Sequence, residues 1–268
     1  MILSGKRYSW IGEKANEIRC FLSFWKKKFK KRMFFSFLLT ALCGRMDLKC
    51  LFLGGVTLFA YAFTFLVALA VTFVLTPVVK NFAIRIGAVD KPDARKVHHG
   101  LVPRLGGLAI YAGFMVSAIT TIGFTYEMVG IMAGATFLII VGVADDVVSL
   151  RPKVKLLGQI IAAAIPVVIF NINIDWINVP WHGIVYLPAV ISIPLTIFWI
   201  IGFINTVNLI DGLDGLAAGI ATIASIAIAL LAFQMGQWTA AAAMVAMTGA
   251  CLAFLQYHFN PAKIYMGD

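Results

Sequence analysis

The sequence predicts an all-α, polytopic bundle of about seven transmembrane helices. Of its 268 residues, 61% are hydrophobic and only 13% are charged, whereas soluble domains carry roughly a quarter charged residues. Uninterrupted apolar runs, such as 58–79 and 128–144, approach the roughly 20 residues that a helix needs to cross a bilayer. The strands of a membrane β-barrel would alternate over about 10 residues, and this alternation is missing.

Each expected span is a long apolar run bounded by charged residues or by Gly, Pro and Asn. The spans are 52–79, 106–124, 128–144, 156–171, 184–204, 215–235 and 238–257. The connections between them alternate between two kinds. One kind is polar and comprises 80–105, 145–155, 205–214 and 258–268, whereas the other kind is short and comprises 125–127, 172–183 and 236–237.

Every Lys and Arg after residue 50 falls in the polar connections. By the positive-inside rule, these connections face the cytoplasm, which makes the chain a multi-pass protein of the inner (cell) membrane. The same connections hold five carboxylates, namely Asp145, Asp146, Asp211, Asp214 and Asp268. The distribution of Lys and Arg and the positions of the carboxylates therefore both predict a single site on the cytoplasmic side.

The formal charge of +10 does not indicate a nucleic-acid partner, because residues 1–45 alone carry a net +9. This basic segment fits the topology badly. It could hold a short extra span near 33–44, lie on the membrane surface, or precede a natural start at Met46, and we favour the last. We therefore divide the chain into a basic extension, 1–45, and a transmembrane domain, 46–268. The four scattered cysteines have no metal-binding spacing and are interpreted as packing residues.

The segment Asn205-Thr-Val-Asn-Leu-Ile-Asp-Gly-Leu-Asp214-Gly is the strongest chemical signal. In a helix, Asn205, Asn208 and Asp211 would share one face, and Asp214 would follow three residues later. Two carboxylates and two amides suit Mg²⁺ with a phosphate, or the polar edge of a nucleobase. An Asn/Asp/Gly turn that caps the next helix explains the pattern equally well.

Asp145 and Asp146 end an apolar run just before three basic residues. Neighbouring helical residues point about 100° apart, so one carboxylate should be primary and the other supporting. A solvated helix end, with acids paired to downstream lysines, is the alternative. In the first polar loop, Lys96, His98 and Arg104 could bind a diphosphate, or they could simply be the topogenic positive charge of a cytoplasmic loop.

Four motifs in order resemble those of the polyprenyl-phosphate N-acetylhexosamine-1-phosphate transferases, glycosyltransferase family 4. They are DKPDARKVHHGLVPRLGG, the pair Asp145-Asp146, NTVNLIDGLDGLA and NPAKIYMGD, and the likeness covers about residues 58–268. The phospho-N-acetylmuramoyl-pentapeptide branch typically has Gly-Thr-Pro-Thr-Met-Gly-Gly in the first loop. Here Val102-Pro-Arg-Leu-Gly-Gly stands instead, which is similar to the N-acetylglucosamine-1-phosphate branch.

The resemblance assigns roles to individual residues. It implies Mg²⁺, or Mn²⁺, held by Asp268 with Asp211 and Asp145. It implies catalytic roles for four residues, Asp145, Asp146, Asp211 and Lys96. It implies substrate contacts for seven residues, Asn205, Asn208, Asp214, Asn260, Tyr265, His98 and Arg104, with Tyr265 stacking on the uracil and Asp214 directed toward it.

The implied reaction moves a sugar 1-phosphate from a UDP-sugar to undecaprenyl phosphate and releases UMP, the first membrane step of a cell-envelope polysaccharide. The partners are these two substrates and the bilayer, and a homodimer is compatible with the resemblance. The family pattern has further spans and a His-rich motif after the position of Asp268. We therefore expect a C-terminally truncated chain that makes no lipid-linked sugar on its own.

Other classes are kept as alternatives. They are the muramoyl-pentapeptide transferase, an ion-coupled transporter, a CDP-alcohol phosphatidyltransferase and an inactive remnant. The phosphatidyltransferase spacing D-G-x₂-A-R-x₈-G-x₃-D-x₃-D is not found in the chain. Carboxylates at one membrane face, away from the midplane, disfavour a transporter.

Overall fold

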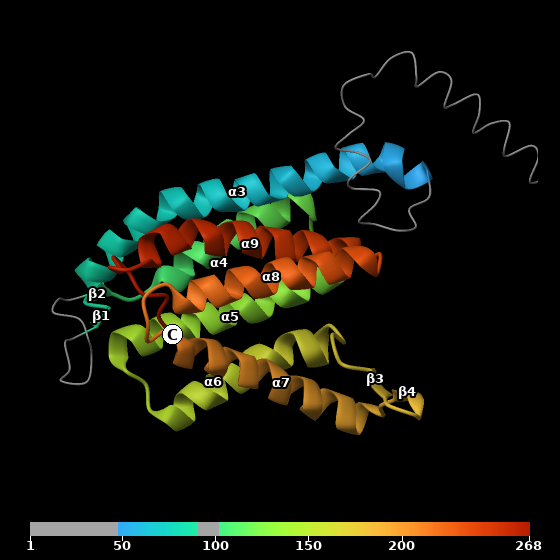
Figure 1. Ribbon diagram of the computed structural model, residues 1–268. Coiled ribbons are helices and arrows are strands. Elements are labelled where there is room, and N and C mark those ends of the chain that lie inside the picture. Colours follow the sequence, from blue (N-terminus) through green and yellow to red (C-terminus); the bar gives the residue numbers. More distant parts are fainter. Residues whose placement is uncertain (1–47, 91–101) are drawn as a thin grey trace, which may run out of the picture. The chain divides into compact units, whose positions relative to one another are not determined.

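A computed structural model describes residues 48–90 and 102–268, with side chains from Leu58 on except that of Asp90. Residues Leu58–Asp268 form one compact unit. The helices are α3 (Leu48–Ile86), α4 (Gly106–Thr121), α5 (Tyr126–Val148), α6 (Pro152–Ala164) with the π-helical η1 (Ile165–Ile169), α7 (Ala189–Ile210), α8 (Leu216–Gln234) and α9 (Trp238–His258), as Figure 1 shows. Two antiparallel strand pairs join them, β1 (Val89–Asp90) with β2 (Val102–Pro103) and β3 (Trp176–Val179) with β4 (Gly183–Tyr186).

The predicted helical membrane bundle is confirmed, with one difference in the number of spans. Six helices of the described residues are long and apolar enough to cross a membrane, and α4 is a shorter apolar helix. The sequence predicts a span over 106–124, but the observed helix α4 is shorter and ends after 16 residues, at Thr121. Gly123 then adopts a φ of 77°, which does not continue a helix.

The predicted span 184–204 was placed too early in the chain. Its first residues belong to the β3–β4 hairpin, and α7 begins only after Pro188. At the other end α7 continues to Ile210, through residues that we had assigned to a loop. The helix tolerates these polar residues because Asn205 and Thr206 donate side-chain hydrogen bonds to carbonyls four residues earlier, at 2.9 and 2.7 Å.

Small residues bring α3, α4 and α9 together. A Cβ atom on Gly113 of α4 would lie 1.9 Å from the Thr72 hydroxyl of α3, and one on Gly249 of α9 would lie 2.5 Å from the Phe65 carbonyl. Close backbone approach of this kind is how membrane helices gain packing contacts without large apolar side chains between them. Many large apolar side chains, such as Phe59 and Leu209, point outward, as a lipid environment allows.

The segment after α9, Asn260–Asp268, is held against the start of α4. Tyr265 N donates to Pro103 O at 2.9 Å, while Gly106 N and Gly107 N donate to the carbonyls of Tyr265 and Met266 at 2.9 and 2.7 Å. We call Asn260–Asp268 the C-terminal segment. These hydrogen bonds place its last residues next to the ends of α5 and α7 (Figure 1).

Candidate active site

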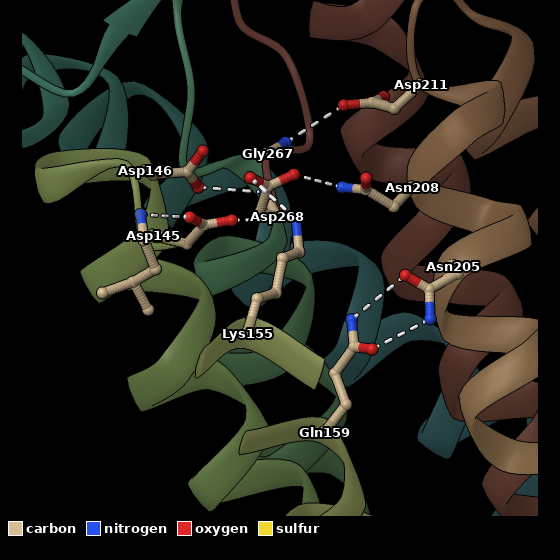
Figure 2. A network of polar contacts seen from close by, with 10 residues as sticks. Asp145, Asp146, Lys155, Gln159, Asn205, Asn208, Asp211, Gly267 and Asp268 are labelled. Carbon is tan, nitrogen blue, oxygen red and sulfur yellow. Dashed lines mark hydrogen bonds and ion pairs between the residues drawn. The ribbon is translucent and has the colours of Figure 1, made fainter. Parts of the chain in front are cut away.

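Asp268 lies at the centre of a polar network that joins three helices (Figure 2). One carboxylate oxygen accepts a hydrogen bond from the Asn208 amide of α7, and the other lies 3.1 Å from Lys155 Nζ of α6. The backbone N–H of Asp268 donates to Asp146 Oδ2 of α5 at 3.0 Å. The polar loops that the sequence predicts to share one membrane face therefore do meet in a single site.

Lys155 is a residue of this site that the sequence analysis missed. Its Nζ also lies 2.8 Å from Asp145 Oδ2, so one ammonium group bridges two carboxylates. Asp145 Oδ1 accepts from Leu150 N at 2.8 Å, just after α5 ends at a left-handed Ser149. Asp145 thus pairs with a downstream lysine, as the alternative interpretation expected, but it is only 7% exposed and is not a solvated helix end.

Two buried carboxylate oxygens in the site have no hydrogen-bond partner among the described residues, Asp146 Oδ1 and Asp211 Oδ1. Both residues line a cavity of about 370 Å³, together with Asn208, Gly267 and Asp268. The other wall is apolar and comes from α4, α5 and α7.

No three His, Cys, Asp or Glu side chains of the described residues are arranged to hold a metal ion by themselves. The predicted ligand set of Asp268, Asp211 and Asp145 is therefore not found as a preformed site. Both Asp145 oxygens already have partners, whereas Asp146 has an unpaired oxygen. Because Mg²⁺ is usually held by one or two carboxylates, with waters and substrate phosphates as its other ligands, Asp146 and Asp211 fit a cation that binds together with a phosphate.

Burial raises the pKa of Asp211 to about 7, although hydrogen bonds from Gly267 N and Met266 N and the charge of Arg104 oppose the rise. The Gly267 bond is 3.0 Å long.

Asp211 Oδ1 lies 3.3 Å from His258 Nε2, outside hydrogen-bonding geometry. The His258 Nδ1 atom lies 3.2 Å from the Ile264 carbonyl, which can only accept. A neutral His258 ring that donates this hydrogen bond carries its proton on Nδ1, so the Nε2 atom that faces Asp211 has none. One further proton between Nε2 and Asp211 Oδ1 would link the two side chains by a hydrogen bond.

Asp214 holds the C-terminal segment and does not cap the next helix. Its oxygens accept from Ala262 N at 3.0 Å and from the Tyr265 hydroxyl at 2.9 Å. The N-cap of α8 is Gly215, which has no side-chain cap. The Tyr265 ring is 5% exposed and packs edge-on to His258, with the ring centroids 5.7 Å apart. The predicted stacking of Tyr265 on uracil stays a prediction.

The remaining predicted residues are placed as follows. Asn205 faces α6 and pairs with Gln159, a second residue that the sequence analysis missed. Asn260 is exposed at the start of the C-terminal segment. Arg104 lies between β2 and α4, close enough for its charge to lower the pKa of Asp211. Lys96 and His98 lie outside the described residues.

Gly142 of α5 offers a test of how closely the C-terminal segment must approach α5. A Cβ atom there would lie 2.8 Å from the Asp268 carbonyl carbon and 2.9 Å from its oxygen. Alanine favours the helix by roughly 1 kcal/mol over glycine, so Gly142→Ala should insert normally but displace Asp268. If the site carries out the reaction that the resemblance implies, its turnover should fall at least tenfold at unchanged membrane yield. Gly219→Ala, whose added Cβ would meet nothing within 4 Å, is the control and should keep full turnover. Normal turnover of Gly142→Ala would show that the position of Asp268 is not critical.

Comparison with known proteins identifies the family of the chain. The sequence profile of glycosyl transferase family 4 matches residues 128–268. A probable undecaprenyl-phosphate N-acetylglucosaminyl 1-phosphate transferase of Bacillus subtilis is 41% identical over 205 residues, which cover 76% of this chain and 57% of the relative. A decaprenyl-phosphate N-acetylglucosaminephosphotransferase of Mycolicibacterium smegmatis is 35% identical over 238 residues, covering 80% and 57%.

A phospho-N-acetylmuramoyl-pentapeptide-transferase of Listeria monocytogenes is less similar, at 28% identity over 234 residues, which cover 79% of this chain and 71% of the relative. The chain spans 57% of the length of the two N-acetylglucosamine-phosphate relatives. The family match covers more than half of the chain and includes the carboxylates on α5, just after α7 and in the C-terminal segment. The chain belongs to glycosyl transferase family 4.

Proposed function

We propose that the protein transfers N-acetylglucosamine 1-phosphate from its UDP-sugar to undecaprenyl phosphate and releases UMP. The observation that carries the proposal is Asp268, held between Lys155 and Asn208 beside a cavity with two unpaired carboxylate oxygens. The names of the relatives support the choice of sugar and lipid. The Val-Pro-Arg-Leu-Gly-Gly sequence at 102–107 also favours this branch over the muramoyl-pentapeptide branch.

In the proposed reaction, a phosphate oxygen of the lipid attacks the sugar-linked phosphorus of the UDP-sugar. The bond from this phosphorus to the bridging oxygen breaks, and UMP leaves with that oxygen. The lipid phosphate is already an anion, so the protein mainly has to align two phosphates and reduce their repulsion. Lys155 is a cation that the described site places among its carboxylates, and one carboxylate of the site would accept any remaining proton.

We propose Mg²⁺, or Mn²⁺, as the cofactor. Asp146 and Asp211 would hold it through their unpaired oxygens, and Asp268 would complete the site by exchanging one of its contacts, with Asn208 or with Lys155, for the cation. When bound, the cation neutralises phosphate charge and fixes the diphosphate. The chain itself supplies the cavity and the orientation of the carboxylates, since Gly267 N fixes Asp211 and Asp268 N fixes Asp146.

The function can be tested in the protein expressed at its natural length, in membranes of a strain without its own transferases. UDP-N-acetylglucosamine, undecaprenyl phosphate and Mg²⁺ should give UMP and lipid-linked sugar, and chelation should stop both. Product from UDP-N-acetylmuramoyl-pentapeptide alone would assign the protein to the other branch. If neither donor releases UMP in the presence of the lipid, the proposal fails and the transporter hypothesis returns.

The two carboxylates of α5 should separate by role. Asp146→Asn is expected to lower turnover at least a hundredfold, because it removes the charge from a cavity-lining group with an unpaired oxygen. Asp145→Asn should weaken turnover about tenfold, because Lys155 keeps Asp268 as its partner. UMP release measured for both variants at equal membrane yield decides this. Equal, small losses of turnover would mean that both carboxylates only lie at the end of α5 and take no part in the reaction.

We also propose that the site faces the cytoplasm of the inner membrane. The connection at Ser149, between α5 and α6, would then be cytoplasmic, and the turn at Gly236, between α8 and α9, would be external. A cysteine at Gly236 should react with an impermeant thiol reagent in intact cells, whereas one at Ser149 should not. Labelling at Ser149 from outside would reverse the orientation.

A further inference from the structure

Two polar connections, one helical turn apart, join α6 to α7 (Figure 2). The first runs through Asp268, which contacts both Lys155 of α6 and Asn208 of α7. The second is a direct pair of side-chain amides. Gln159 Nε2 donates to Asn205 Oδ1 at 3.3 Å, and Asn205 Nδ2 donates to Gln159 Oε1 at 2.8 Å.

One member of the amide pair is buried in the apolar part of the bundle, whereas Asn205 lies at an exposed position of α7. Gln159 is only 3% exposed and has the small residues Gly158, Ala162 and Ala163 as buried neighbours on α6. A buried amide is costly unless its donors and acceptors are satisfied, and in lipid no water can replace a lost partner. Because each amide both donates and accepts, the reciprocal geometry fixes the distance and the relative height of the two helices.

The spacing along each helix links this pair to the site. Lys155 and Gln159 are four residues apart on α6, and Asn205 and Asn208 are three residues apart on α7, so both members of each pair lie on one helix face. A shift of α6 along α7 that breaks the amide pair would therefore also move Lys155 relative to Asn208. Both residues must reach the same Asp268 carboxylate, which leaves little tolerance for such a shift.

We infer that Gln159 is a positioning residue, whose amide pair with Asn205 holds α6 and α7 in register so that Lys155 and Asn208 contact Asp268 together. This inference rests on the proposed transferase function and deepens it. It gives the Asn205 side chain a role between helices, in place of the substrate contact that the sequence predicts. Gln159 itself acts only through the other residues.

Four variants of the natural-length protein test the inference kinetically. Gln159→Leu and Asn205→Leu each remove the pair, and we expect kcat to fall at least tenfold while KM for the UDP-sugar stays within about threefold, because misalignment of reacting groups mainly affects the chemical step. The double variant Gln159→Asn/Asn205→Gln keeps the summed side-chain length and should recover at least a third of the original kcat. Gln159→Glu keeps the shape but loses the donor, and it replaces Gln159→Leu if that variant does not insert.

The matched control is Tyr111→Phe. Tyr111 OH and Thr136 Oγ1 form another hydrogen bond between helices, α4 and α5, at 2.6 Å. Its loss removes a contact of the same kind outside the site, so kcat should change less than twofold. An equal loss of kcat in Tyr111→Phe would show that any weakened helix contact has this effect, and it would overturn the inference.

A spectroscopic measurement tests the register without activity. Spin labels at Lys153, in the first turn of α6, and at Leu209, near the end of α7, are both at exposed positions. Their distance distribution by double electron–electron resonance should broaden or shift in Gln159→Leu, stay unchanged in Tyr111→Phe, and return in the double variant. If the wild type makes no lipid-linked sugar, the proposed function fails while this measurement still decides the register.

Three further results would also overturn the inference. The first is an unchanged distance distribution in Gln159→Leu. The second is a double variant that stays as slow as the single variants, because a pair that only spans two helices should tolerate the exchange. The third is an Asn205→Leu variant that raises KM more than it lowers kcat, which would restore the predicted substrate contact of Asn205.

Discussion

Replacement of Asp268 by Asn is expected to reduce turnover to less than a tenth of the wild-type value. Burial raises the pKa of Asp268, but the Asn208 amide and the Lys155 ammonium group, which donate hydrogen bonds to the carboxylate, outweigh this effect and keep the pKa below its usual value. The residue therefore acts as an anion. An amide is a weak ligand for a hard cation such as Mg²⁺, and it also leaves Lys155 with a single carboxylate partner, Asp145.

The measurement is UMP release at saturating Mg²⁺, with Asp175→Asn as the control. Asp175 is an exposed carboxylate just before β3, bonded to Asn173 at 2.8 Å, and its neutralisation should change turnover less than twofold. A tenfold loss corresponds to only about 1.4 kcal/mol of barrier. An Asp268→Asn variant that keeps more than a tenth of the activity would therefore exclude a central role for this carboxylate.

The carboxylates of the site could be predicted from the sequence because charged residues stand out in an apolar chain. Asp211 and Asp268 interrupt or follow long hydrophobic runs, and ionisable groups at membrane depth cost enough to be retained mainly for function. Lys155 does not stand out from its neighbours in this way, because it is one of several basic residues in a polar connection. Gln159 and His258 are polar residues in largely apolar helices, where the hydrophobic pattern does not distinguish them from other polar residues nearby.

The path of the C-terminal segment could not be predicted, because it depends on pairing between distant parts of the chain. Tyr265 N bonds to Pro103 O, and Gly106 N bonds to Tyr265 O. No local pattern specifies such contacts. The same limit explains the error at α7, where hydropathy ends the predicted span at residue 204 but the helix continues to Ile210, with side-chain hydrogen bonds to the Ile201 and Gly202 carbonyls.

The fold was easier to predict than the site for a physical reason. A bilayer forces each spanning segment to satisfy its own backbone hydrogen bonds, so length and hydropathy alone indicate helices such as α8 and α9. The site depends on which helix ends meet, and these contacts come from glycines that allow close approach. Gly142 against Asp268 and Gly267 against Asp146 are two such contacts.

Lys155→Met is expected to cause the second large loss, at least a hundredfold in kcat, or roughly 2.7 kcal/mol of barrier. The lysine is the cation between Asp145 and Asp268, whose side chains are 8% and 20% exposed. Its removal leaves two carboxylates near each other with little solvent, which costs both stability and the alignment of Asp268. Lys153→Met, two residues earlier on the exposed face of α6, should leave kcat within twofold.

Stability and catalysis can be separated with the double variant Lys155→Met/Asp145→Asn. Removing one negative charge relieves the repulsion, so the melting temperature in detergent should recover most of what Lys155→Met loses. Turnover should stay low, because no ammonium group reaches Asp268 and the phosphates beside it. Recovery of turnover together with stability would mean that Lys155 only neutralises buried charge. Recovery of stability alone would show that the positive charge of Lys155 takes part in the reaction.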